Sequence, residues 1–346
     1  MFGRMWRAIA LVIAAWAIAG VGATPGLAQR PPRIVAIGDL HGDYAAYRAI
    51  VRAAGLIDDS DRWTGGEAVL VQTGDVPDRG ADTLSIIRHL MRLQREALQV
   101  GGQVVALVGN HEMMNVTGDL RYVHPDEFAA FADGSSVRRR RRAYQANHAA
   151  IEQSYRARGR AMSGHAIHRA WLEDTPLGKV EHRAAWAPEG EIGRWVVSNP
   201  AVALIDGTLF AHGGISAAYA AMPIDEINRR VAAEIAARSD APDAIIHDSA
   251  GPLWYRGLVN RESGEGDRAP PQMSVEEELD AVLRAHGARR IVVGHTPVPE
   301  GIAIRHDGRL IAIDTGISAH YGGARSYLEI IGDRVVAHVV SGEDGQ

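Results

Sequence analysis

The sequence of 346 residues contains no cysteine. This absence excludes a disulfide framework, a thiolate metal site and a cysteine nucleophile, so any catalysis must use other side chains. Basic residues are not in excess either, since 37 lysines and arginines stand against 42 aspartates and glutamates. A general nucleic-acid binder would show a basic excess, and we therefore expect no nucleic-acid partner.

The N-terminus carries a long apolar run between a cationic start and a stretch of small residues. The run is AIALVIAAWAIAGVG, and the small residues end at Ala28. This order is typical of a secretory signal peptide over residues 1–28. We expect an exported, periplasmic protein without stable membrane insertion after signal cleavage; an uncleaved N-terminal anchor that faces the periplasm is the alternative. Loss of Arg4 and Arg7 with the signal changes the formal net charge from −5 to −7.

The remaining chain repeats a pattern in which a short apolar run ends in a glycine and polar residues. RIVAI runs into GDLHGD, EAVLVQT into GDVPDRG, QVVALV into GNHE, ARRIVV into GHTP and GRLIAI into DTG. Uniformly apolar runs of about four to eight residues predict strands that are buried on both faces of a sheet. Two further stretches, ALIDGTLFA and SYLEIIGDRVVAHVV, predict hairpins that turn at Asp206-Gly207 and Gly332-Asp333.

Helical patterns lie between several of these predicted strands. YAAYRAIVRAAG and TLSIIRHLMRLQREAL repeat apolar residues at helical spacing. SVEEELDAVLRAHG begins with Ser274 and Glu277 in capping-box register and ends at Gly287. Strand–helix–strand order followed by hairpins predicts an α/β sandwich, in which the polar residues share the carboxyl edge of the strands.

The pattern is interrupted between about 117 and 195 by an arginine-rich stretch. We interpret this stretch as an inserted, helical cap segment that covers the edge of the sheet, within one catalytic domain that spans 29–346. A solvated linker is the alternative. The run RRRRR at 138–142 predicts a solvated face, and recruitment of an anionic substrate is its second interpretation.

Five predicted strands end in residues whose side chains are of types that can bind metal ions. The polar side chains at these ends are Asp39, His41, Asp75, Asn110, His111, His212 and His295. Carboxylates, imidazoles and amide oxygens are ligands of divalent transition-metal ions, and a carboxylate such as Asp75 can bridge two ions. Each motif alone is a weak signal, but five in order, each directly after an apolar run, predict a two-metal site.

These motifs carry a resemblance to a known family. GDLHGD, GDVPDRG, GNHE, HGG and GHTP, in this order, resemble the signature of the calcineurin-like metallophosphoesterases, and GDxxDRG with GNHE is similar to their phosphoprotein-phosphatase branch. LVGNHEMMN at 107–115 and GPLWYRG at 251–257 resemble the Shewanella-like protein phosphatases. The resemblance covers about 33–330 and matches nothing in the segment 117–195. It implies a metallophosphatase-type α/β/β/α sandwich.

The resemblance also implies two divalent metal ions as cofactors, with manganese expected first and iron, zinc or cobalt as alternatives. The matching metal ligands are Asp39, His41, Asp75, Asn110, His212 and His295. Among them, Asp75 matches the carboxylate that bridges the ions. A hydroxide shared by the two ions would then attack phosphorus directly, without a covalent enzyme intermediate.

Further roles follow from the same resemblance. His111 matches the proton donor to the leaving group, and Asp78 matches the carboxylate that orients this histidine. Arg79 matches a phosphate clamp, Arg256 is a second candidate clamp, and Asn110 and His111 complete the phosphate-binding set. The GPLWYRG motif around Arg256 departs from the LLWSDP form of the branch.

Three other acidic residues in the motifs are interpreted as structural. Glu112 and Asp314 would support loops by accepting hydrogen bonds from backbone amides. Asp43 stands where a helix is predicted to begin and is interpreted as a helix-start residue and not as a ligand.

The sequence thus predicts an exported metal-dependent phosphatase whose partner is a phosphorylated protein or peptide. The motifs read only the phosphate, so phosphotyrosine, phosphoserine and phosphothreonine all stay open. The alternative on the same scaffold is a phosphoesterase such as a symmetrical diadenosine tetraphosphate hydrolase. Those enzymes resemble this chain in GDLHGD and GHTP, but they show GNHD and lack the acid that matches Asp78. A phosphopeptide-binding protein without turnover is the third hypothesis, although no site residue is missing.

Overall fold

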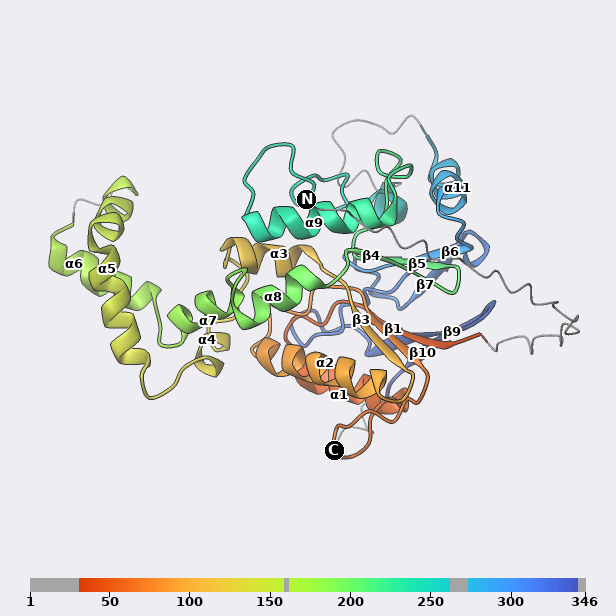
Figure 1. Ribbon diagram of the computed structural model, residues 1–346, viewed down its shortest axis with the longest axis horizontal. Coiled ribbons are helices and arrows are strands. Elements are labelled where there is room, and N and C mark those ends of the chain that lie inside the picture. Colours follow the sequence, from red (N-terminus) through yellow and green to blue (C-terminus); the bar gives the residue numbers. More distant parts are fainter. Residues whose placement is uncertain (1–30, 159–161, 262–272, 342–346) are drawn as a thin grey trace, which may run out of the picture. The chain divides into compact units, whose positions relative to one another are not determined.

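Two five-stranded sheets form the centre of the fold, which the computed structural model describes for residues 31–158, 162–261 and 273–341 (Figure 1). The first sheet has the strand order β10–β9–β1–β2–β3, and the second has the order β4–β5–β6–β8–β7. The first sheet consists of β1 (Arg33–Ile37), β2 (Val69–Gln72), β3 (Gln103–Ala106), β9 (Ser326–Ile331) and β10 (Arg334–Val339). The second consists of β4 (Val202–Ile205), β5 (Thr208–Ala211), β6 (Arg290–Val293), β7 (Ala303–Arg305) and β8 (Leu310–Ala312).

The predicted signal peptide, residues 1–28, lies outside the described residues. Within the three described ranges, no helix has both the length and the apolar composition that a membrane crossing requires. Export therefore stays a prediction from the sequence.

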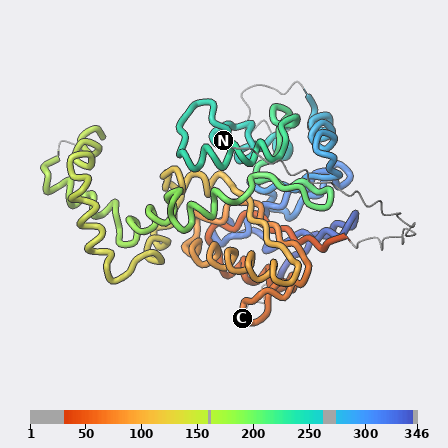
Figure 2. The backbone as a smooth tube through the Cα atoms, in the orientation of Figure 1, coloured from red at the N-terminus to blue at the C-terminus, as the bar shows by residue number. Residues whose placement is uncertain are grey.

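Both sheets contain three parallel strands, and their carboxyl ends lie at one edge of each sheet. In the first sheet β1 runs parallel to β2 and β2 to β3, and in the second sheet β5 runs parallel to β6 and β6 to β8. The two ends of the described chain meet in the first sheet, because β1 pairs with the antiparallel β9 (Figure 2). This topology confirms the predicted α/β sandwich and brings the polar strand ends together.

Alternation along the strands explains why the sheets pack face to face. Ile34 and Ala36 of β1 lie in an apolar cluster that includes Phe210 of the second sheet. Their neighbours Val35 and Ile37 belong to the other cluster, which contains the flanking helices. Successive side chains of a strand point to opposite faces, so a strand buried on both faces must be apolar throughout. Each fully buried aliphatic side chain of this size contributes about 1.5–3 kcal/mol.

Helices flank the paired sheets on both sides (Figure 1). α1 (Tyr44–Ala53) and α2 (Thr83–Leu98) lie on the side of the first sheet, and α9 (Ile224–Ala237) and α11 (Val275–Ala285) lie on the opposite side. The bounds of α2 coincide with the predicted segment. The capping box of α11 is present as predicted, because Ser274 Oγ accepts from Glu277 N and the Glu277 carboxylate accepts from Ser274 N.

The segment 117–195 is helical, as the sequence predicted. Its helices are α4 (Glu127–Ala130), α5 (Ser136–Ala157), α6 (Gly164–Asp174), α7 (Lys179–Trp186) and α8 (Glu191–Ser198). α7 contacts α3 (Asn110–Thr117), and α8 contacts both α3 and α9. Within the segment, α7 and α8 therefore pack against the helix that follows β3, while α5 packs against α6 and α7.

Three elements named here, β7, α9 and α10 (Gly257–Asn260), had no counterpart in the sequence analysis. The edge strand β7 is only three residues long, which is too short for a periodic pattern. Helix α9 carried a usable signal, because Ile227, Val231 and Ile235 are buried at intervals of four residues. The short helix α10 also had no prediction.

A buried acid–histidine pair joins the helical segment to α2. Glu127 Oε1 lies 3.1 Å from His182 Nε2, and Thr83 Oγ1 donates to Glu127 Oε2 at 2.8 Å. All three side chains are inaccessible to solvent. Burial, together with the charge of Asp78, raises the pKa of Glu127 to about 8, and burial lowers the pKa of His182 to about 3. At neutral pH both groups are therefore uncharged.

Replacement of Glu127 by glutamine should make stability less dependent on pH. The folded protein keeps the Glu127 proton up to about pH 8, whereas the unfolded chain releases it near the ordinary value of 4.5. Between these values the folded state binds more protons, so stability falls as pH rises, by up to about 1.4 kcal/mol per pH unit. Relative to the parent, the glutamine variant should gain in unfolding midpoint between pH 5 and pH 8. If the unfolding midpoint changed with pH by the same amount in the parent and in the glutamine variant, this linkage would be contradicted.

Candidate active site

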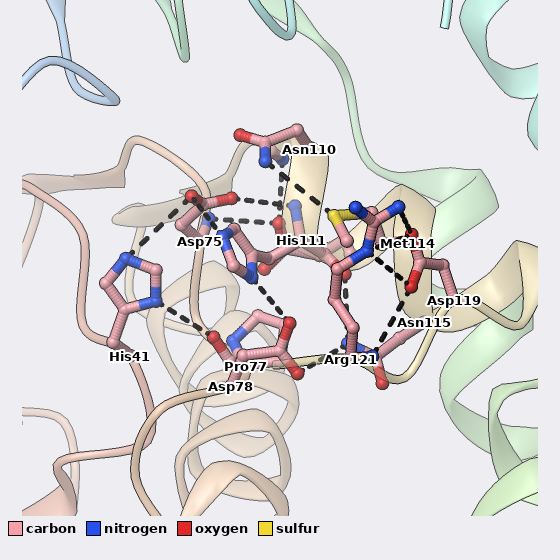
Figure 3. A network of polar contacts seen from close by, with 12 residues as sticks. His41, Asp75, Pro77, Asp78, Asn110, His111, Met114, Asn115, Asp119 and Arg121 are labelled. Carbon is pink, nitrogen blue, oxygen red and sulfur yellow. Dashed lines mark hydrogen bonds and ion pairs between the residues drawn. The ribbon is translucent and has the colours of Figure 1, made fainter. Parts of the chain in front are cut away.

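The loops that follow the parallel strands converge on the side chain of Asp75 (Figure 3). Its carboxylate lies 3.9 Å from His41 Nε2, 3.8 Å from His111 Nε2 and 3.3 Å from His212 Nε2. Two groups of potential metal ligands share Asp75: one with His41 and His111, the other with His212 and His295. In each group the ligand atoms lie within 4.8 Å of one another. The arrangement suits a carboxylate that is shared by two cations.

Backbone carbonyls set the orientation of two of these imidazoles. His41 Nδ1 lies 3.1 Å from the carbonyl oxygen of Pro77, and His212 Nδ1 lies 2.9 Å from that of Thr73. A neutral ring that donates from Nδ1 keeps a lone pair on Nε2, the usual arrangement of a metal-binding histidine. In His212 that atom lies 2.9 Å from Asn110 Oδ1, so the imidazole nitrogen and the amide oxygen could share one cation.

The ligand group of Asp75, His212 and His295 contains a further buried nitrogen, Nε2 of His295. His295 Nε2 is buried and has no hydrogen-bond partner among the described residues. Asp39 lies next to this histidine without belonging to either ligand group, and both of its oxygens accept from the backbone amide of His295 at 3.2 Å. The buried imidazoles, carboxylates and amide oxygen therefore fit divalent ions of intermediate hardness.

The ionisation of the buried groups also bears on cation binding. Burial and the nearby carboxylates of Asp314 and Asp75 raise the pKa of Asp39 well above its usual value. Burial also acts on Asp75, but the imidazoles of His212, His111 and His41 hold its pKa well below the usual value. Burial lowers the pKa of His41 to about 4, so this ring is neutral and ready to bind a cation.

His111 and Asp78 form a buried hydrogen-bonded pair at the opening of α3 (Figure 3). The Asp78 carboxylate lies 2.5 Å from His111 Nδ1, which leaves Nε2 directed to the side of Asp75. Burial opposes the charged ring, but Asp75 and Asp78 together raise the pKa of His111. Asn115 Nδ2 donates to the second oxygen of Asp78 at 2.9 Å. The pair is thus held from both sides.

Two arginines border the site. Arg79 follows Asp78 directly, and its Nε is buried without a hydrogen-bond partner among the described residues. Its guanidinium lies over the ring of Tyr122, 4.0 Å from the centroid. Arg256 Nη1 donates to the backbone carbonyl of His295 at 2.6 Å, which places the second arginine beside the metal-ligand group.

The site loops adopt backbone conformations that side chains rarely take. The residues with positive φ are His41 (44°), Asp75 (57°), Asp78 (75°), Arg79 (67°) and His295 (61°). Left-handed backbone costs an ordinary residue about 1 kcal/mol or more, and such residues concentrate at functional sites. The loops after β1 and β2 also touch through their glycines, because a Cβ added at Gly42 would lie 2.6 Å from the backbone of Gly80.

The three acids that were interpreted as structural do accept backbone hydrogen bonds. Glu112 accepts from the amides of Gly109, Asp75 and Val76 at 2.8–2.9 Å. Asp314 Oδ1 accepts from the amide of Gly316 at 3.0 Å. Asp43 is the N-cap of α1, where its Oδ1 accepts from the amide of Ala46 at 2.8 Å and its Oδ2 accepts from that of Ala319 at 2.9 Å.

The sequence analysis missed several side chains at the site. Asn115 had a signal, since it stands four residues after His111 on one helix and so shares its face. Tyr122 had none, because its position depends on the fold of a loop. A groove of about 450 Å³ opens beside His41 and Arg79, and His124 and His320 contribute to its walls. Of the residues that line this groove, His124 belongs to the segment 117–195.

Known proteins are similar to this chain over most of its length. A family model described as Calcineurin-like phosphoesterase matches residues 32–299. Shewanella-like protein phosphatase 2 of Arabidopsis thaliana is 34% identical, with 90% of this chain and 78% of the relative covered. An uncharacterized protein of Schizosaccharomyces pombe is 33% identical, with 87% of this chain and 77% of the relative covered.

Solved structures share the fold. The crystal structure of a cold-active protein-tyrosine phosphatase from a psychrophilic Shewanella species superposes with a TM-score of 0.64 at 26% identity, with 90% of this chain and 81% of that chain covered. A Saccharomyces cerevisiae protein serine/threonine phosphatase superposes with a TM-score of 0.52 at 13% identity, over 90% of this chain and 81% of that chain. The second likeness shows the fold alone.

Proposed function

Because the chain belongs to the calcineurin-like phosphoesterase family, and is therefore a hydrolase of phosphate esters, we propose that it is a dinuclear metal-dependent protein phosphatase. The observation that carries the proposal is the set of metal-ligand atoms gathered around Asp75. Two of the three nitrogens nearest this carboxylate belong to rings whose other nitrogen meets a backbone carbonyl. These carbonyl contacts support the proposal, because they leave Nε2 of both rings to face the proposed cations.

Each of the proposed ions has its own ligands on this chain. His41, Asp39 and the shared Asp75 would hold the first ion, and Asp75, Asn110, His212 and His295 would hold the second. When bound, the two ions would supply Lewis-acid activation of water and of the phosphate oxygens. Manganese is the first candidate, and a mixed nitrogen and oxygen donor set also accepts iron, zinc or cobalt.

The other side chains would handle the phosphate and the leaving group. Arg79 would bind phosphate oxygens, because its buried Nε has no hydrogen-bond partner among the described residues, and Arg256, which donates to the carbonyl of His295, would add further donors. His111 would transfer the proton on Nε2 to the leaving oxygen, while Asp78 holds the ring through Nδ1 and stabilises its charge. No cysteine or serine nucleophile is required.

A phosphorylated protein or peptide is the proposed substrate. The Arabidopsis relative is named a protein phosphatase, and the Shewanella structure is described as a protein-tyrosine phosphatase. The groove beside His41 and Arg79 is partly open, so that a side chain attached to a main chain could enter it. We propose phosphotyrosine, phosphoserine and phosphothreonine as the substrate classes, and the groove residues His124 and His320 as contacts that can discriminate among them.

Release of phosphate by the full chain tests the proposal. The protein is stripped with chelator, reloaded with manganese, and given matched phosphotyrosine and phosphoserine peptides together with diadenosine tetraphosphate. Metal-dependent release from a peptide supports the proposal, and the ratio between the peptides gives the residue preference. Cleavage of the dinucleotide alone would show another phosphoesterase on the same scaffold. Release that persists in chelator would refute the metal-dependent mechanism.

A further inference from the structure

Tyr122 lies between the two side chains that would handle the phosphate ester. The guanidinium of Arg79 lies over its ring, 4.0 Å from the centroid. The imidazole of His111 packs against the same ring with the two centroids 5.2 Å apart, at an interplanar angle of 41°. Tyr122 also accepts a hydrogen bond at its backbone carbonyl from the amide of Arg79 at 2.9 Å. One residue therefore contacts both functional groups.

The loop that carries Tyr122 is itself well held. Asp119 accepts two hydrogen bonds at 2.8 and 2.9 Å from Nε of Arg121. The Arg121 guanidinium lies 5.7 Å from the Tyr122 ring centroid, so the ring has a second cation nearby. The amide of Val123 donates to the carbonyl of Leu120 at 3.2 Å, which closes a turn. These contacts restrict the backbone on both sides of Tyr122.

The support of Arg79 by a ring has a physical advantage over support by an acid. A carboxylate partner would occupy the N–H donors of the guanidinium and neutralise its charge. An aromatic face attracts the cation and leaves the in-plane N–H groups free. Among the residues that the structure describes, Arg79 forms no ion pair with a carboxylate, and its buried Nε is without a partner. The ring thus orients the arginine and leaves its N–H donors available for a phosphate group.

We propose that Tyr122 is a positioning residue that holds the Arg79 guanidinium ready for the phosphate group, an inference that rests on the proposed function of the same site. The ring holds the cation, and the backbone hydrogen bond holds the loop at Arg79. A side chain of similar size without a π face should keep the second contact and lose the first. Phosphate affinity should then fall although the metal centre and the fold stay intact.

Phosphate binding measures this effect without the need for turnover. Inorganic phosphate is titrated calorimetrically into the manganese-loaded full chain, in the parent and in Tyr122→Leu, Tyr122→Phe and Arg79→Ala variants. We expect Tyr122→Leu to raise the phosphate Kd by about 3- to 30-fold, the range of a cation–π contact between exposed and desolvated settings. Tyr122→Phe keeps the π face and should stay within about twofold of the parent.

A double variant separates positioning from a general structural role. In the Arg79→Ala background, Tyr122→Leu should change the phosphate Kd by less than about twofold, because its partner is already gone. Equal weakening in both backgrounds would overturn the proposal, and so would an unchanged Kd in the single Tyr122→Leu variant. Metal content and the unfolding midpoint are measured in parallel to confirm that each variant is folded and loaded.

Tyr144→Leu is the matched control in the same segment. Tyr144 is also partly buried and packs against rings, with centroids 4.3 Å from His168 and 5.0 Å from Trp171, but neither ring belongs to the site. Its loss should leave the phosphate Kd unchanged. If Tyr122 and Arg79 are coupled in phosphate binding but no phosphopeptide is hydrolysed, the proposed function fails while the positioning role stands. If phosphopeptides are hydrolysed but the two residues act independently, the positioning role fails while the proposed function stands.

Discussion

Replacement of His111 by asparagine lowers the turnover of phosphoserine peptides by about 10²- to 10⁴-fold, the usual contribution of a positioned acid. The reason is geometric: Nδ1 of His111 meets Asp78, so Nε2 is directed to the side of Asp75 and can donate a proton to a leaving oxygen there. Asparagine keeps the backbone amide, which donates to Asp75 Oδ1 at 2.9 Å. His111 lies in the ligand group of His41 and Asp75. The proposed ligands of that ion are nevertheless Asp39, His41 and Asp75, so manganese content should be unchanged. Steady-state kinetics and elemental analysis of the same preparation check both statements.

The loss should also depend on the leaving group. A serine alkoxide needs a proton as it departs, whereas p-nitrophenolate is stable without one. Turnover of p-nitrophenyl phosphate should consequently fall less than that of the peptide. His148→Asn is the matched control, because His148 is exposed on α5 and should be silent. An equal loss with both substrates, or a loss of manganese, would contradict the role of His111 as a proton donor.

Asp75→Asn should abolish stable binding of both ions and lower turnover by at least about 10³-fold. Asp75 faces His41, His111 and His212, and it is the carboxylate common to the two ligand groups. An amide has one donor oxygen and no charge, so it cannot bridge two cations. Losses of only about 10- to 100-fold in metal affinity are typical of groups that support a ligand from outside. The number of manganese ions per chain after gel filtration is the measurement.

Asp78→Asn is the matched control for Asp75→Asn, because it replaces an aspartate by asparagine three residues further along the chain. Asp78 contacts His111 and Asn115 and belongs to neither ligand group, so its variant should keep both ions while its turnover falls. The two variants together separate a bridging carboxylate from an orienting one. Retention of two ions by Asp75→Asn would overturn the shared-ligand assignment, whatever its effect on activity.

The parts of the fold that the sequence predicted are those with a local signal. β1 and α2 have the predicted bounds, because an unbroken apolar run and a 3.6-residue repeat each extend over the whole element. The position of α8 against α9 and the short strand β7 depend on contacts with distant residues. No pattern within a few residues can specify such contacts, and the paths of the helices between 117 and 195 were out of reach for this reason.

In the candidate site, too, the residues with a local sequence signal were predicted and those that depend on tertiary contacts were not. Its proposed ligands each follow a parallel strand, and the carboxyl ends of such strands meet, so motif order was enough to gather Asp39, Asp75 and His295. The contacts of Asn115 with Asp78 and of Tyr122 with Arg79 are tertiary, and only the folded chain shows them. The roles of all these residues, like export from the cell, stay predictions until they are measured.

The left-handed backbone at His41, Asp75, Asp78, Arg79 and His295 has an implication for engineering. Glycine adopts this conformation without steric cost, so glycine at any of the five positions relieves strain in the folded state. Selection for heat resistance alone would therefore not protect these side chains against replacement by glycine. Directed evolution of a more robust enzyme should couple every thermal challenge to an activity screen and leave these loops outside the mutagenised region.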